Sequence, residues 1–311
     1  MSLDIVVAFF ILGLVATLLG AKIDFPKGLY QTCVLFLLLA IGLKGGYALH
    51  QHAGENILVQ SIAVILFGFL LPFVAYPLLR WFGGWSKTDA AATAAHYGSV
   101  SVGTYAVAVA ILDVQNIAYE AYFPLFVALL EAPAIAIGIM LARQKGQCLN
   151  IKVLAHEIFF NQGVFLLLGG LVIGAWAGDR VQSVQPFFGT LFHGVLALFL
   201  LAMGQKAAEK LHDLKTQSAF LISFGIFMPL IGALAGALLG SMLELSLGGV
   251  VLMAVLGASA SYIAVPAALS VSLPQANLSL ALTASLAVTF PFNVIVGIPL
   301  YLSLAQHWFG G

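Results

Sequence analysis

Two short stretches of this chain combine glycine or alanine with hydroxyl-bearing residues inside long apolar segments. They read Gly98-Ser99-Val100-Ser101 and Ala258-Ser259-Ala260-Ser261. Such stretches can interrupt a membrane helix, whose freed N–H and C=O groups are tolerated only where they line a cavity or bind a ligand. A helix that resumes near Ser99 or Ser259 presents unpaired N–H groups and about half a positive charge, which predicts a pocket for a small oxyanion. The predicted substrate-binding residues are Gly98, Ser99, Ser101, Thr104, Ser259, Ala260 and Ser261.

The first half of each interrupted helix ends near Tyr97 or Gly257 and exposes carbonyl oxygens, the ligands that hard cations such as sodium prefer. Glu131 lies inside an apolar segment, where an ionisable group is a functional candidate by default, although a structural hydrogen bond is its alternative role. For Asp89 we favour helix capping, and His96 is either a hydrogen-bond partner beside the break or a packed neutral histidine. The predicted cation-binding residues are Asp89, Thr93, His96, Glu131, Thr289 and Asn293.

Membrane helices must position these residues, because the composition is that of an integral membrane protein. Hydrophobic residues make up 62% of the chain and charged residues 8%, against roughly 25% charged residues in soluble domains. The formal net charge is zero, which gives no basis for nucleic-acid binding. Cys33 and Cys148 have neither metal-site nor disulfide spacing. The chain has no Walker-type phosphate loop, so we expect no ATP coupling and no cofactor, with sodium as the coupling ion.

Apolar runs of about 20 residues can cross a bilayer, and we predict about ten such spans with short polar breaks. They are 3–21, 29–49, 57–81, 88–112, 119–142, 157–177, 186–205, 218–243, 247–272 and 276–304. Ten of the twelve lysines and arginines fall in the loops after spans 1, 3, 5 and 7 or at their edges. Basic loops remain in the cytoplasm, so both termini are expected outside a multi-pass inner (plasma) membrane protein. The two remaining basic residues are Lys44, which we expect to snorkel to the interface, and Arg180.

Three echoes along the chain indicate an internal repeat. Gly42 and Lys44 align with Gly204 and Lys206 at an offset of 162, and the two serine stretches align at 160. Residues 136–139 resemble 295–298 at an offset of 159. The prediction is an all-α fold with a 5+5 inverted repeat, 1–142 and 156–304, in which helices 4 and 9 are the broken pair. Close helix packing through small residues is the alternative interpretation of the breaks.

The segment 87–101, Lys-Thr-Asp-Ala-Ala-Ala-Thr-Ala-Ala-His-Tyr-Gly-Ser-Val-Ser, resembles the signature of the sodium-dependent bicarbonate transporters first known from cyanobacteria. Gly-Leu-Lys-Gly-Gly at 42–46, Pro-Leu at 124–125 and Glu-Ala-Pro-Ala at 131–134 also look like that family. The likeness runs from the first span to the tenth.

This resemblance implies sodium–bicarbonate symport by an elevator mechanism, with substrate bound where spans 4 and 9 cross. It implies a gate domain of spans 1, 2, 6 and 7, a core domain of spans 3–5 and 8–10, and a homotrimer surrounded by membrane lipid. In the family, a PII-like protein binds the cytoplasmic face. Here the segment between the halves is short, about 143–156, which puts that partner in doubt.

Other interpretations remain open at this point. The same pocket could hold another small carboxylate, with selectivity set by pocket size around Tyr97, Tyr105 and Tyr262. Sodium–proton antiport through Glu131 is a weaker alternative. An intramembrane hydrolase is disfavoured because His96 and Ser99 have neither a nucleophile-elbow sequence nor an evident orienting carboxylate, so we expect no enzyme. A receptor would need a signalling domain, which the predicted loops are too short to hold.

Overall fold

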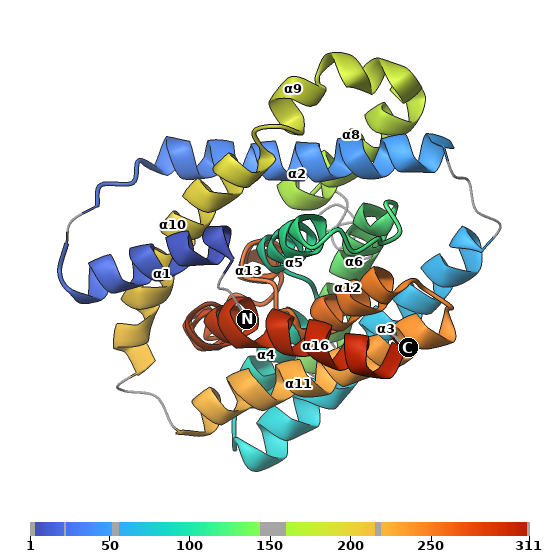
Figure 1. Ribbon diagram of the computed structural model, residues 1–311. Coiled ribbons are helices and arrows are strands. Elements are labelled where there is room, and N and C mark those ends of the chain that lie inside the picture. The colour runs from blue at the N-terminus through green and yellow to red at the C-terminus, as the bar shows by residue number, and fades with distance from the viewer. Residues whose placement is uncertain (1–3, 22, 52–55, 144–159, 215–218, 310–311) are drawn as a thin grey trace.

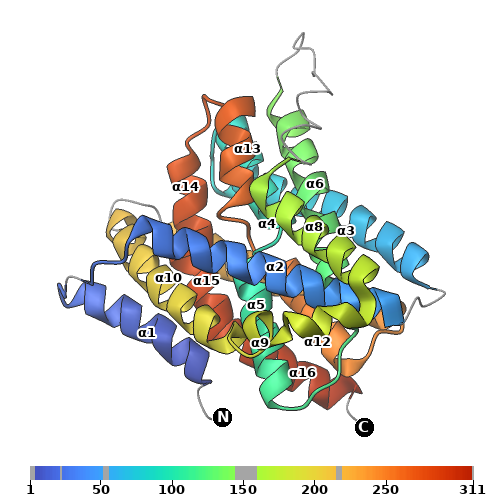
Figure 2. The same ribbon diagram turned by 90° about the horizontal axis from the view of Figure 1, so that it is seen from above.

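The computed structural model describes residues 4–21, 23–51, 56–143, 160–214 and 219–309, and within them every regular element is a helix (Figure 1). Both termini lie at the same end of the bundle (Figure 2). The predicted short segment 143–156 lies, apart from its first residue, outside the described residues.

The first half of the chain forms six α-helices. The bounds are α1 Ile5–Leu18, α2 Lys27–Gln51, α3 Ile57–Pro77 with a π-helical turn at Leu78–Phe82, α4 Lys87–Gly98, α5 Val102–Val114 and α6 Phe123–Ala142.

The second half is divided more finely. It comprises α8 Gln162–Ala177, a 3-10 turn at Gly178–Ser183, α9 Gln185–Phe188, α10 Phe192–Leu214, α11 Ala219–Met242, α12 Leu247–Ala258, α13 Ala264–Ser272, α14 Leu278–Leu282, α15 Phe290–Phe292 and α16 Ile298–Phe309. Two π-helical turns, Thr283–Thr289 and Asn293–Gly297, lie between α14 and α16.

Eight described helical segments are long and apolar enough to cross a membrane. They correspond to predicted spans 2–8 and 10, whereas spans 3–21 and 247–272 correspond to shorter apolar helices. The first of these, α1, ends early because Gly20 (φ +80) closes a Schellman motif, in which the Ala21 N–H donates to the Ala16 carbonyl. The region between predicted spans 186–205 and 218–243 is helical as far as Leu214, since α10 continues beyond the apolar run.

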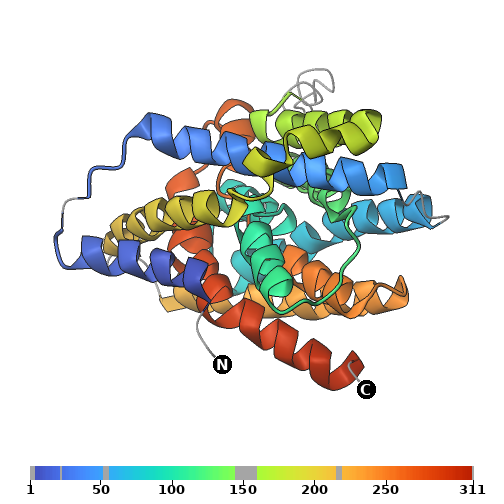
Figure 3. The same ribbon diagram turned by 45° about the horizontal axis from the view of Figure 1, so that its top comes forward.

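Glycines allow two close helix pairs. On α2, a Cβ at Gly42 would lie 2.6 Å from the Leu167 carbonyl oxygen of α8, and Gly46 meets the Leu171 carbonyl. On α10, Gly204 meets the backbone of α1 in the same way. These pairs, α2 with α8 and α1 with α10, run side by side in Figure 3. The helices α3, α4 and α6 pack on one another, as α12 does on α11 and α16.

The two predicted interruptions are present, but each second half-helix begins later than we expected. The first break occupies 99–101 and the second 259–263, so that α5 begins at Val102 and α13 at Ala264. Ser99 and Ser259 have extended backbones (ψ 172 and 162). The chain stays extended because the two breaks hydrogen-bond to each other before helix resumes.

Candidate functional site

The two interrupted helices cross at their breaks and are joined there by three hydrogen bonds. The Ser101 N–H donates to Ser259 Oγ at 3.1 Å, and the Ser261 N–H donates to the His96 carbonyl at 2.8 Å. His96 Nδ1 lies 2.6 Å from the Ser261 carbonyl oxygen. Because a carbonyl only accepts, Nδ1 carries the hydrogen. His96 is fully buried, and its role in this structure is to hold the crossing together.

The N-terminus of α5 presents two backbone N–H groups that the helix does not use. The first four N–H groups of a helix have no partner within it. Here the Thr104 N–H donates to Ser101 Oγ at 3.1 Å and the Tyr105 N–H to the Ser101 carbonyl at 3.0 Å. The remaining groups belong to Val102 and Gly103, and both residues line a cavity.

The N-terminus of α13 faces the same cavity. Its cap residue, Ile263, makes no side-chain hydrogen bond, and Ser261 Oγ accepts the Val265 N–H only at 3.4 Å. The next residue, Pro266, has no N–H. Ala264, the first residue of α13, also lines the cavity, and its N–H has no hydrogen-bond partner among the described residues. Two helix N-termini at one cavity favour an anion there.

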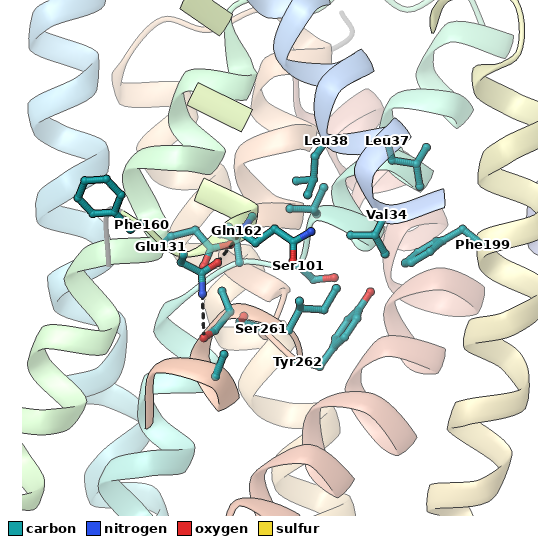
Figure 4. A pocket seen from close by; sticks show the side chains of 18 residues that line it. Val34, Leu37, Leu38, Ser101, Glu131, Phe160, Gln162, Phe199, Ser261 and Tyr262 are labelled. Atoms are coloured by element: carbon teal, nitrogen blue, oxygen red, sulfur yellow. Dashed lines mark hydrogen bonds between the residues drawn. The ribbon is translucent and has the colours of Figure 1, made fainter. Parts of the chain in front are cut away.

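The cavity has a volume of about 350 Å³ and lies between the crossing and α2, α8 and α10. Figure 4 shows Glu131, Ser101 and Ser261 among its polar groups. The opposite wall is apolar and comes from α2 and α10; it is formed by Val34, Leu37, Leu38 and Phe199. The cavity extends to Gln162 at the start of α8. Its size suits a small anion with room for a few waters or a short apolar group.

Only part of the predicted substrate set lines this cavity. Ser101 and Ser261 do, whereas the other members support the wall from behind. Ser259 binds the Ser101 N–H, Gly98 packs against Pro72 of α3, and the Thr104 N–H donates to the Ser101 hydroxyl that caps α5. Ser99 and Ala260 are buried within the breaks.

Glu131 on α6 is the one predicted cation-binding residue on the cavity wall. Its side chain is 4% exposed, and the Ser99 hydroxyl donates to Oε2 at 3.2 Å. A carboxylate this deep needs either a proton or a nearby cation, because desolvating an unpaired charge costs several kcal/mol. It therefore provides a place where charge can be exchanged next to an anion.

Three other predicted cation-binding residues lie near the crossing without lining the cavity. Thr289 donates its hydroxyl to the Gly225 carbonyl at 2.6 Å, so the Tyr97 hydroxyl must be the donor in their 2.7 Å contact. The Asn293 side chain donates to the Ala258 carbonyl at 2.8 Å, which satisfies the last carbonyl of α12. Thr93 is buried, and its hydroxyl oxygen is among the described buried atoms without a hydrogen-bond partner. Thr289 and Asn293 belong to π-helical turns, which are frequent at functional sites.

Asp89 is not brought to the crossing. It lies in the first turn of α4, where its carboxylate accepts the Ser86 hydroxyl at 2.7 Å and the Asn277 N–H at 2.8 Å. The N-cap of α4 is Ser86, whose hydroxyl oxygen accepts the Asp89 N–H at 3.0 Å, so Asp89 supports the cap from the first turn and does not cap the helix itself. The structure thus links the start of one broken helix to the loop after the other.

Sequence reasoning missed the matching contact at α12. Glu120, in the loop after α5, accepts the backbone N–H of Ser246 at 2.6 Å and its hydroxyl at 3.2 Å. Ser246 caps α12 as Ser86 caps α4. When the two repeats are aligned, position 120 falls near Asn277, so the repeat could have indicated Glu120. Of the three tyrosines expected to set selectivity, only Tyr262 lines the cavity.

Comparison with known protein families places the chain. Residues 5–306 match the Na+-dependent bicarbonate transporter superfamily, so the protein belongs to this superfamily of membrane transporters. Comparison with curated proteins gives no match.

Proposed function

We propose that the protein is a secondary active transporter that couples sodium entry to the uptake of bicarbonate. One observation carries this proposal: the N-termini of α5 and α13 meet at a single cavity within a chain of the bicarbonate transporter superfamily. Bicarbonate is small and planar, with oxygen atoms that accept hydrogen bonds. The free N–H groups of Val102, Gly103 and Ala264 supply donors for it without a lysine on the cavity wall.

Sodium coupling follows from the charges around the cavity. A bound anion beside an ionised Glu131 would face a like charge, and a sodium ion at Glu131 removes that repulsion. The proposed sodium ligands are Thr93, His96, Glu131, Thr289 and Asn293, while Asp89 lies away from them at the start of α4. One sodium ion carried with one bicarbonate moves no net charge, so at that ratio the chemical gradients alone drive uptake.

We further propose an elevator-type movement between two helix groups. The gate would consist of α1, α2, α8 and α10, whose glycine-lined pairs pack closely. The core would contain the remaining helices, including both broken ones. The paired caps support an inverted repeat, because Asp89 joins the start of α4 to the loop at Asn277, and Glu120 joins the start of α12 to the loop after α5. The cavity lies where α2 and α10 meet the crossing.

With the basic loops in the cytoplasm, both termini would lie outside the inner (plasma) membrane, and the cavity beside the start of α8 would face inward. We also propose a homotrimer by analogy with the family. A PII-like partner would have to bind the cytoplasmic face, where most of the loop between the halves lies outside the described residues.

A second substrate class is favoured by one feature of the cavity. Its wall of Val34, Leu37, Leu38 and Phe199 offers apolar contact that bicarbonate does not need. A short-chain carboxylate would place its carboxylate on the helix N-termini and its alkyl group against this wall. The transport mechanism would be unchanged.

Uptake of radiolabelled bicarbonate into proteoliposomes tests the proposal. We expect accumulation with an inward sodium gradient that is lost when potassium replaces sodium. Protein-free liposomes at the same mildly alkaline pH measure the leak through dissolved carbon dioxide. Sodium-dependent uptake of acetate that bicarbonate does not inhibit would instead assign the second substrate class. Uptake equal in both salts would contradict sodium coupling.

A further inference from the structure

A second cavity of about 530 Å³ lies toward the other end of α2. It is bounded by the later half of α2, by α5 and by the turn before α10, and it includes Lys44, Val109, Asp113 and Tyr119. None of these residues lines the anion cavity. On the orientation proposed above, this outer cavity faces the outside of the cell.

Three polar contacts close this end of the bundle. Lys44 Nζ on α2 lies 3.1 Å from Asp113 Oδ2 and donates to Tyr119 Oη at 2.6 Å. The Tyr119 hydroxyl in turn donates to Asp113 Oδ1 at 3.0 Å. Burial and the Asp113 carboxylate raise the pKa of Tyr119 above its ordinary value, so the hydroxyl keeps the proton that it donates. Lys44 therefore makes specific contacts with the core in addition to the snorkelling to the interface that its sequence position suggests.

These contacts act on the helix that forms the anion site. Asp113 is in the last turn of α5, and Val102, at the other end of the same helix, lines the anion cavity. The two ends are separated by about 16 Å of continuous helix. Beside Lys44, Gly45 packs directly against Pro124 of α6, so α2 is held to both α5 and α6 at this end.

Lys206, which aligns with Lys44 in the internal repeat, makes a different kind of contact. The ammonium of Lys206 on α10 lies 3.2 Å from the centre of the Tyr30 ring on α2. That contact joins two helices of the proposed gate, whereas the Lys44 contacts join the gate to the core. Of these two lysines, Lys44 is therefore the one that connects the proposed gate to the proposed core.

We propose that Lys44 is a positioning residue that holds the outer end of α5 against α2 in this arrangement and releases it when the cavity opens outward. The inference rests on the proposed alternating access. The side chains of Lys44 and Asp113 are 53% and 34% exposed, so the pair is weak enough to break in each cycle. Such pairs shift an equilibrium by about two- to fivefold.

Cysteine labelling of the full-length protein in membranes tests this role without any substrate. In a background with Cys33 and Cys148 replaced by alanine, single cysteines at Val109 and Ala40 report on the outer cavity; both side chains are now buried. Lys44→Gln should raise the rate of reaction with an impermeant thiol reagent about two- to fivefold. The factor should be the same at both positions, because one equilibrium exposes them.

The matched control is Arg180→Gln, which removes a positive charge whose contacts among the described residues are with Trp176 and Ala177. The charge-swapped pair Lys44→Asp with Asp113→Lys should restore the slow rate. Tyr119→Phe, which keeps the ion pair, provides a milder variant if Lys44→Gln does not fold, with a smaller rise. Unchanged rates, a rise at Val109 alone, or an equal rise in the control would overturn the proposal. These rates do not depend on which anion is carried, so they are separate from the test of bicarbonate uptake.

Discussion

The two broken helices have the same plan but carry different chemistry. The first break is three residues long and Ser101 caps its second half, whereas the second break is five residues long and Ile263 makes no cap bond. His96 and Glu131 are buried side chains at the crossing that can carry a charge near neutral pH, and both come from the first repeat. The second repeat contributes neutral groups such as Asn293. Under the proposed function, both repeats would hold the anion, while the first would also bind the accompanying cation.

The largest effect is expected from filling the shared cavity at the start of α5. A Cβ at Gly103 would collide with the Tyr262 hydroxyl and lie 2.9 Å from Phe199. Gly103→Ala should therefore reduce uptake by about five- to 150-fold, since overpacking costs about 1–3 kcal/mol and the crowded atoms line the cavity. Gly169→Ala is the matched control, because nothing lies within 4 Å of its added Cβ. Equal uptake by both variants would show that the cavity is not the binding site.

An intermediate effect should follow from neutralising the charge in the first repeat. Glu131→Gln keeps the side-chain shape and can still accept the Ser99 hydroxyl, so the protein should fold normally. Without the carboxylate, sodium should stimulate uptake several-fold less than in the parent protein. Glu244→Gln, an exposed carboxylate change, controls for net charge. A sodium titration that overlays that of the parent protein would return Glu131 to a purely structural role.

The smallest effect is expected from substituting the cap residues of the two second half-helices, α5 and α13. Ser101→Ala removes the side-chain acceptor of the Thr104 N–H and should destabilise the protein by about 1 kcal/mol. Ile263→Ala, at the cap of α13, removes no such bond. Any loss of stability in this variant should therefore come from lost packing. Thermal unfolding in detergent measures both. A larger loss of stability in Ile263→Ala would mean that the two helix starts depend on packing and not on capping.

Local composition predicted the breaks because small and hydroxyl residues recur at equivalent positions of the two repeats, which close helix packing alone does not require. It could not predict that α13 begins at Ala264. That start depends on the hydrogen bond from the Ser261 N–H to the His96 carbonyl. These two residues are 165 positions apart in the sequence. The sequence also offered no sign that Lys44 meets Asp113, since their contact depends on how α2 lies against α5.

The residues that fill the cavity wall illustrate the same limit. Ser101 and Ser261 were predicted from their types, whereas Val102, Gly103 and Ala264 also line the cavity and would contribute their backbone N–H groups. Backbone donors have no signature in side-chain chemistry. Only the positions at which helices begin reveal them.

The most direct test is a cryo-electron microscopy map of the protein with sodium and bicarbonate, compared with one in potassium without bicarbonate. The account predicts a difference peak within hydrogen-bonding distance of the Val102, Gly103 and Ala264 N–H groups. A peak only in the outer cavity beside Lys44, or unchanged density between the two helix N-termini at saturating ligand, would contradict it.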